Sequence, residues 1–153
     1  MTQKMRKRMS TVEGNIIKRI FYMPKRHRHT KLMAACKIES TNLYINKSKL
    51  KLLLRLCNNF ITKKILEYQL GIIQKKRINK SCLISEISEL INKEIRTIDE
   101  LYQEAAIKLG EINNEIKNFR NSTETNQIRE CLEKPNKKNA ARLVELTKPE
   151  EMK

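Results

Sequence analysis

Residues 84–119 read ISEISELINKEIRTIDELYQEAAIKLGEINNEIKNF, and apolar positions recur at steps of three or four throughout the stretch. These positions are Ile84, Ile87, Ile91, Ile95, Ile98, Leu101, Ala105, Leu109, Ile112, Ile116 and Phe119. Because an α-helix completes a turn every 3.6 residues, this spacing puts all of them on one face. The pattern predicts a long amphipathic, coiled-coil-like helix over 80–120. Thr97 followed by Glu100 fits a capping box, so two shorter helices meeting there are the alternative.

A second periodic segment precedes this one. Between 47 and 76 the positions spaced by three or four are Leu50, Leu53, Leu54, Cys57, Ile61, Ile65, Tyr68 and Ile72. We therefore expect a helix at 47–76, joined to the next one through the polar residues 74–81. Asn79 or Ser81 is expected to cap the second helix. The two segments predict an antiparallel helical hairpin, or a small helical bundle, as the core at 47–120.

The flanking segments complete an all-α prediction. Three Gly, three Pro and no Trp leave few of the turn residues that hairpins and barrels need. Residues 1–46 are predicted to be a flexible basic arm, mobile over 1–14, with short helical segments such as KLMAAC at 31–36. Residues 121–153 are predicted to contain short helices around Pro135, namely IRECLEK and NAARLVEL.

Charge is distributed unequally along the chain. The 153 residues carry a formal net charge of +16. Residues 1–80 hold 21 Lys and Arg against three Glu, a balance of +18, whereas 81–153 hold 12 against 14 acidic residues, a balance of −2. A uniform bias toward lysine would load both halves. The asymmetry favours a polyanionic partner for the first half.

The densest cationic stretch, KRIFYMPKRHRHTK at 18–31, interleaves basic and aromatic side chains. Cations neutralise phosphates and release counterions, and aromatic rings stack on unpaired bases. We predict a nucleic-acid-binding surface, for DNA or RNA, formed by Arg19, Tyr22, Lys25, Arg26, Arg28, Lys63, Lys64, Lys75, Lys76 and Arg77. For the long helix we predict an assembly interface, with a homodimer or a helical protein as partner, formed by Ile87, Ile91, Ile98, Leu101, Leu109 and Ile112.

Catalytic, metal and cofactor chemistry find little support in the sequence. His27 and His29 with Cys36 lack a fourth zinc ligand and fit no standard finger. There is no glycine-rich phosphate loop and no GxSxG motif. We therefore expect a non-enzymatic protein with no catalytic residue, no metal and no cofactor.

The compartment is expected to be intracellular, cytoplasmic or nuclear. No apolar run approaches the roughly 20 residues of a membrane span, and no secretory signal follows the basic start. Four cysteines without a CxxC pair are expected to be free thiols. The acid-poor MRKRMSTVEGNIIKRIFYM at 5–23 leaves organellar targeting, or attachment to an anionic membrane, as alternatives.

Two segments resemble known folds. EISELINKEIRTIDEL at 86–101 resembles a helix-turn-helix whose second helix begins near Thr97, with Asn92 in place of the usual turn glycine. That second helix carries Asp99, Glu100 and Glu104, which phosphates repel. Residues 31–95 are similar to a histone fold, which implies an unbroken central helix at 47–76, a DNA-contacting loop at KKRIN and a histone-like partner.

Two function classes follow. The first is electrostatic binding of nucleic acid by the basic half, with the long helix used for assembly. The second is a helical interaction or scaffold protein whose positive charge is incidental.

Overall fold

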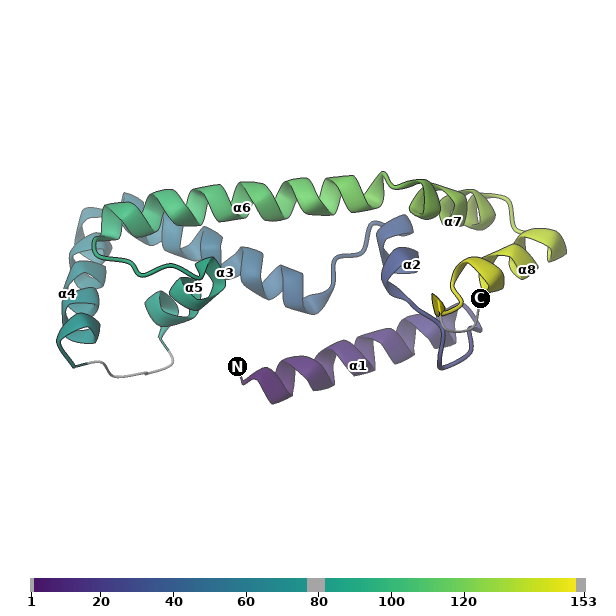
Figure 1. Cartoon of the computed structure of the whole chain (residues 1–153), viewed down its shortest axis with the longest axis horizontal. Helices are drawn as coiled ribbons and strands as arrows, with labels where there is room; N and C mark the ends of the chain where they lie inside the picture. Colours follow the sequence, from purple (N-terminus) through teal and green to yellow (C-terminus); the bar gives the residue numbers. More distant parts are fainter. Residues whose placement is uncertain (1, 77–81, 151–153) are drawn as a thin grey trace. The chain divides into compact units, whose positions relative to one another are not determined.

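The computed structural model describes residues 2–76 and 82–150, which form eight helices and no strand (Figure 1). Their bounds are α1 Gln3–Ile20, α2 Thr30–Ala35, α3 Thr41–Asn58, α4 Phe60–Lys76, α5 Leu83–Ile91, α6 Ile98–Arg120, α7 Thr123–Glu133 and α8 Lys137–Leu146. The all-α prediction is confirmed, as are the two short C-terminal helices. Among the described residues, no helix is both long enough and apolar enough to cross a membrane.

The segment predicted as a mobile arm is helical from Gln3 onward. Thr2 Oγ1 accepts a hydrogen bond from the Met5 amide at 3.3 Å and caps α1. Gly14 and Ile17 lie buried on one side of the helix. The prediction of mobility over 1–14 is therefore wrong for residues 3–14. The prediction relied on the polar composition of the segment, but Lys, Arg, Gln and Met have unbranched side chains that also favour helices.

The helix predicted at 47–76 is two helices, and the first begins earlier. Ser40 Oγ accepts from the Leu43 amide at 3.3 Å, and the Glu13 carboxylate accepts from the Thr41 amide, so α3 begins at Thr41. Asn59 interrupts the segment, since its Oδ1 accepts from the amides of Ile61 at 3.0 Å and Thr62. Those are the bonds of an N-cap, and they start a new helix, α4.

This interruption changes which side chains of the segment are buried. Leu50 and Leu53 of α3 are buried as predicted. In α4 the buried side chains are Leu66 and Leu70, whereas the predicted positions Ile61, Ile65 and Tyr68 are exposed and Ile72 is half-buried. The predicted single apolar face is therefore correct for α3 and wrong for α4.

The region predicted as one helix at 80–120 is also divided, at the alternative break. Asn92 has left-handed backbone angles, φ 57° and ψ 41°, and ends α5. Thr97 Oγ1 accepts from the Glu100 amide at 3.2 Å, and the Glu100 carboxylate accepts from the Arg96 amide at 3.1 Å. Thr97 is therefore the N-cap of α6, with Glu100 bonded back to the residue before it, and a continuous helix is wrong.

The N-cap residue of α5 differs from the two that the sequence predicted. Cys82 is the N-cap residue, and its Sγ accepts from the Ser85 amide at 3.5 Å. Asn79 and Ser81, the caps predicted from sequence, lie outside the described residues. So do Arg77 and the rest of the predicted KKRIN loop beyond Lys76.

Neither family resemblance describes the structure well. A histone fold needs an unbroken central helix, and Asn59 divides that segment. The helix-turn-helix resemblance places the second helix correctly near Thr97, but six residues, 92–97, separate α5 from α6. A DNA-reading turn has three or four residues.

The chain divides into two compact units. The first unit contains Met1–Tyr44 and Glu115–Lys153, and the second contains Ile45–Asn114. The first unit therefore joins segments that the sequence pattern separates into an arm and a C-terminal region. Its core cluster comprises Ile17, Met23, Leu32, Met33, Ala35 and Ile128, with Phe21, Leu132, Leu143 and Leu146 packed against it. The second unit takes buried apolar side chains from all four of its helices, α3 to α6.

Glycine substitutions test one detail of the first unit. A Cβ added at Gly14 would lie 2.5 Å from His29 Cε1, whereas Gly71 and Gly110 have nothing within 4 Å. Alanine in place of a helical glycine favours the helix by roughly 0.5–1 kcal/mol. Overpacking against the His29 ring costs about 1–3 kcal/mol, so we expect Gly14→Ala to be destabilising. The Gly71→Ala and Gly110→Ala variants should be stabilised.

Urea denaturation followed by circular dichroism measures all three variants. Stabilisation of all three by the same amount would contradict the packing of His29 over Gly14.

Candidate functional site

The turn that follows α1 carries the most concentrated group of predicted site residues, and we call residues 19–28 the cationic turn. The helix ends in a Schellman motif: the Tyr22 amide donates to Arg19 O at 3.2 Å and the Met23 amide donates to Lys18 O at 2.8 Å. This closure needs a left-handed residue, and Tyr22 supplies it with φ 52°. Glycine is the usual residue there, because a side chain in this conformation costs about 1–2 kcal/mol.

Two buried side chains fix the cationic turn to the first unit. Met23 belongs to the core cluster. His27 is 6% exposed, and its Nδ1 shares a hydrogen bond of 3.1 Å with Thr147 Oγ1. Next to it, the Arg28 amide donates to Thr147 O at 2.9 Å, and Lys18 Nζ donates to Lys25 O at 2.6 Å. The turn is therefore anchored from within and from both ends.

Phe21 packs against the core cluster, whereas Tyr22 and the Lys and Arg side chains of the cationic turn point to solvent. Tyr22 is 95% exposed. The exposed cations around it are Arg19, Lys25, Arg26 and Arg28. Among the described residues, the one carboxylate paired with them is Glu150, 3.5 Å from Arg28 with both side chains more than half exposed. Such a surface pair contributes little to stability, so Arg28 can exchange Glu150 for another anion. The structure thus brings together five of the ten predicted nucleic-acid-binding residues.

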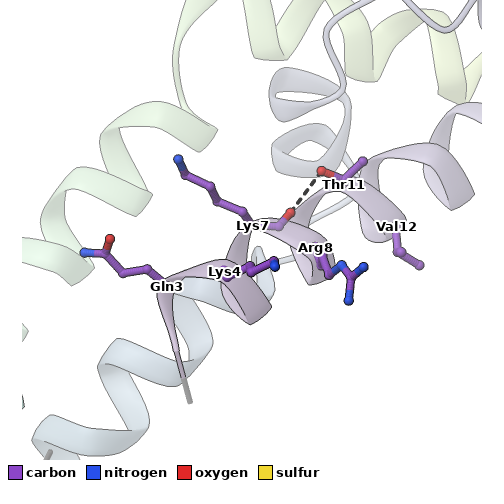
Figure 2. Close-up of a pocket in the computed structure, with 6 residues that line it drawn as sticks. All are labelled: Gln3, Lys4, Lys7, Arg8, Thr11 and Val12. Carbon is purple, nitrogen blue, oxygen red and sulfur yellow. Dashed lines mark hydrogen bonds between the residues drawn. The ribbon is translucent and has the colours of Figure 1, made fainter.

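The outer side of α1 extends the positive charge beyond the predicted residues. Lys4, Lys7 and Arg8 line a shallow hollow with Gln3, Thr11 and Val12, and Thr11 Oγ1 donates to Lys7 O at 2.9 Å (Figure 2). All three cations are exposed. They were absent from the residues predicted to bind, because a mobile arm gives its charges no common side. Their spacing of three and four residues was the available signal.

The other predicted cations belong to the second unit, on α4, and they are less free. Lys63 Nζ donates to Asp99 Oδ1 at 2.7 Å, and this hydrogen bond raises the pKa of Lys63. Lys64 lies 3.4 Å from Glu67 and 5.7 Å above the centre of the Phe60 ring. Lys75 is exposed. Lys76 ends α4, and its side chain lies outside the described part of the chain, as does Arg77.

Carboxylates from the later half of the sequence neutralise part of the early positive charge. Lys31 pairs with Glu124 in the first unit, and Lys49 with Glu86 in the second. Together with the Lys63–Asp99 pair, they reduce the asymmetry that the sequence alone suggests. In the cationic turn, by contrast, Arg28 is the one cation paired with a carboxylate among the described residues.

Burial shifts the pKa values of one histidine and two cysteines. Burial, and secondarily Lys18, lowers the pKa of His29, while Glu13 opposes the shift. Burial raises the pKa of the Cys36 thiol and of the Cys57 thiol, which disfavours the nucleophilic thiolate. Within residues 2–76 and 82–150, no three His, Cys, Asp or Glu side chains gather in a way that could hold a metal ion.

The residues predicted as an assembly interface lie mostly inside the chain. Ile87, Ile98, Leu101 and Ile112 are buried, while Ile91 and Leu109 are half-buried. The four buried side chains need no second chain to cover them. Sequence periodicity marks an apolar face but cannot tell whether the same chain or another one covers it.

No protein family matches this sequence, and neither a curated protein nor a solved structure matches the chain.

Proposed function

We propose that the protein binds nucleic acid without catalysing a reaction, and that the cationic turn is the principal contact. The observation that carries the proposal is Tyr22, a 95% exposed aromatic ring in a left-handed conformation among four exposed cations. The left-handed conformation closes α1, and it leaves the Tyr22 ring in solvent beside these cations. Nothing in the core holds the Tyr22 ring in place.

The chemistry of these side chains favours unpaired strands. Arg19, Lys25, Arg26 and Arg28 neutralise phosphates, and each contact releases counterions. The Tyr22 ring offers a stacking surface to a base, and stacking accepts any base because every base has a π-face. Lys4, Lys7 and Arg8 continue the charge along α1. Such a site binds with little sequence preference, in DNA or RNA, and suits the intracellular compartment expected from the sequence.

Replacing Tyr22 separates binding from stability. Tyr22→Gly should raise the free energy of unfolding by about 1 kcal/mol, because glycine accepts the left-handed conformation. The same change should weaken binding of a single-stranded oligonucleotide roughly tenfold, since stacking is worth about 1–3 kcal/mol per base. Fluorescence anisotropy and thermal denaturation measure the two effects.

Two controls accompany this variant. Lys37 ends α2 in the same left-handed conformation, φ 58°, so Lys37→Gly should be stabilised similarly while keeping the ring of Tyr22. Tyr68→Ala removes another exposed tyrosine, 72% exposed, from α4. If Tyr22→Gly binds as tightly as the wild type, or if Tyr68→Ala loses as much affinity, the cationic turn is not the stacking site.

Protein contact is the second candidate function, favoured by the outer face of α4. Phe60, Ile61, Ile65 and Tyr68 are all more than half exposed, and the last three recur at steps of four and three. This exposed face offers a contact for a second copy of the chain or for a helical partner, whereas the apolar stripe of α5 and α6 is already largely buried. Sedimentation of the wild type and of Ile65→Asp tests this function. The wild type should sediment with a mass above that of the monomer, and Ile65→Asp should sediment as a monomer.

A further inference from the structure

α1 exposes a second surface that the proposed nucleic-acid contact does not use. Five apolar side chains recur along it at steps of three or four, with exposed fractions from 39% to 60%: Met5, Met9, Val12, Ile16 and Ile20. They span 16 residues, or about 22 Å of helix from the first to the last. A continuous exposed apolar strip of this length is unusual in a soluble monomer and marks an interaction surface.

The three faces of α1 have different chemistry. Gly14 and Ile17 face the core of the first unit. The apolar strip follows on one side, and Ile38, 42% exposed, widens it by lining one hollow with Met9, Val12 and Ile16. The cationic side adjoins the strip, since Lys4 and Arg8 line a hollow together with Val12 (Figure 2).

The charge of α1 selects the kind of partner. Its acidic residue, Glu13, is turned toward the start of α3, where both carboxylate oxygens accept from the Thr41 amide at 3.1 and 3.2 Å. The exposed part of the helix therefore offers apolar and positively charged groups. This combination matches an anionic lipid surface, where apolar side chains enter the acyl boundary and Lys and Arg reach the headgroups.

We propose that α1 binds the surface of an anionic lipid bilayer, lying parallel to it with the strip Met5, Met9, Val12, Ile16 and Ile20 inserted below the headgroups. Lys4, Arg8 and Arg19 lie beside the strip and contact lipid phosphates. A nucleic-acid backbone uses the same cations but has no use for the apolar strip. This role is independent of Tyr22, so it stands or falls separately from the proposed function.

The chain has no tryptophan, so a single introduced one reports on its own surroundings. Val12→Trp places the reporter in the strip, and Ile107→Trp places it at a similarly exposed position of α6, 57% against 56%. With phosphatidylcholine vesicles containing phosphatidylserine, the emission of Val12→Trp should shift to the blue, and that of Ile107→Trp should not. Equal shifts for both variants, or no shift for Val12→Trp, would overturn the proposal.

A charge-matched pair separates insertion from simple attraction of a basic protein. Ile16→Asp and Ile107→Asp change the net charge equally, and circular dichroism checks their folding. In vesicle sedimentation, Ile16→Asp should weaken binding at least tenfold, because it puts a carboxylate into the strip, and Ile107→Asp should weaken it by less than about threefold. Equal losses would mean that binding is electrostatic only, which contradicts insertion.

Two further results settle the occupant and the relation to the proposed function. If the protein self-associates without vesicles and Ile16→Asp alone abolishes this, a second copy covers the strip and the membrane proposal is wrong. Tyr22→Gly should retain vesicle binding while losing oligonucleotide affinity. Ile16→Asp should do the reverse.

Discussion

Neutralising the cationic turn with Arg19→Gln, Lys25→Gln and Arg26→Gln is expected to reduce affinity for a single-stranded oligonucleotide by one to two orders of magnitude at low salt. Each contact with a single-strand phosphate contributes about 0.7 to the slope of log K against log salt concentration. The triple variant should therefore lower the magnitude of that slope by about 2. The three side chains are exposed, so the fold should remain intact.

A matched triple variant controls for net charge. Lys134, Lys137 and Lys138 are exposed cations of the same unit, at the junction of α7 and α8. Their replacement by Gln removes the same three charges and should change the slope by less than one. Equal losses in the two triple variants would show that total charge, and not the cationic turn, determines binding.

Truncation of the second unit's core is expected to have the largest effect on stability. Leu101 is fully buried in α6, and Leu101→Ala should reduce the free energy of unfolding by about 3 kcal/mol, the sum of lost transfer energy and a cavity. Ile107 lies in the same helix and is 57% exposed, so Ile107→Ala should change stability by less than about 0.5 kcal/mol. Urea denaturation followed by circular dichroism measures both.

The same comparison addresses the predicted assembly interface. A charge at Ile98, which is buried, would unfold the second unit before it could report on a partner. If Leu101→Ala were as stable as the wild type but lost self-association, Leu101 would be an interface residue and its burial within the chain would be wrong.

Periodicity predicted the helical content well and the helix ends poorly. The apolar spacing runs without interruption through Asn59 and through Asn92–Thr97, because a short break can preserve the register of three and four residues. Thr97 as the N-cap of α6 was visible, since its partner Glu100 is close in sequence. Asn59 as a cap was not, because a single Asn before an apolar run has no distinctive pattern.

The sequence predicted where basic residues cluster along the chain, but not which of them are paired with carboxylates in the fold. Clustering in the sequence found the residues of the cationic turn, since they are neighbours along the chain. The pairing of Lys31 with Glu124 joins positions 93 residues apart, so only the folded chain could show which cations are neutralised. The left-handed conformation of Tyr22 was equally invisible, because tyrosine gives no sequence signal for it.

Photocrosslinking tests the central claim most directly. The four tyrosines are Tyr22, Tyr44, Tyr68 and Tyr102, and the chain has no tryptophan to compete for a photoreactive base. A single-stranded oligonucleotide carrying a halogenated uracil is irradiated with the wild-type protein, and the modified peptide is identified by mass spectrometry. A dominant adduct at Tyr22, lost at high salt, is the predicted result. A dominant adduct at Tyr44, Tyr68 or Tyr102 would contradict the cationic turn as the binding site.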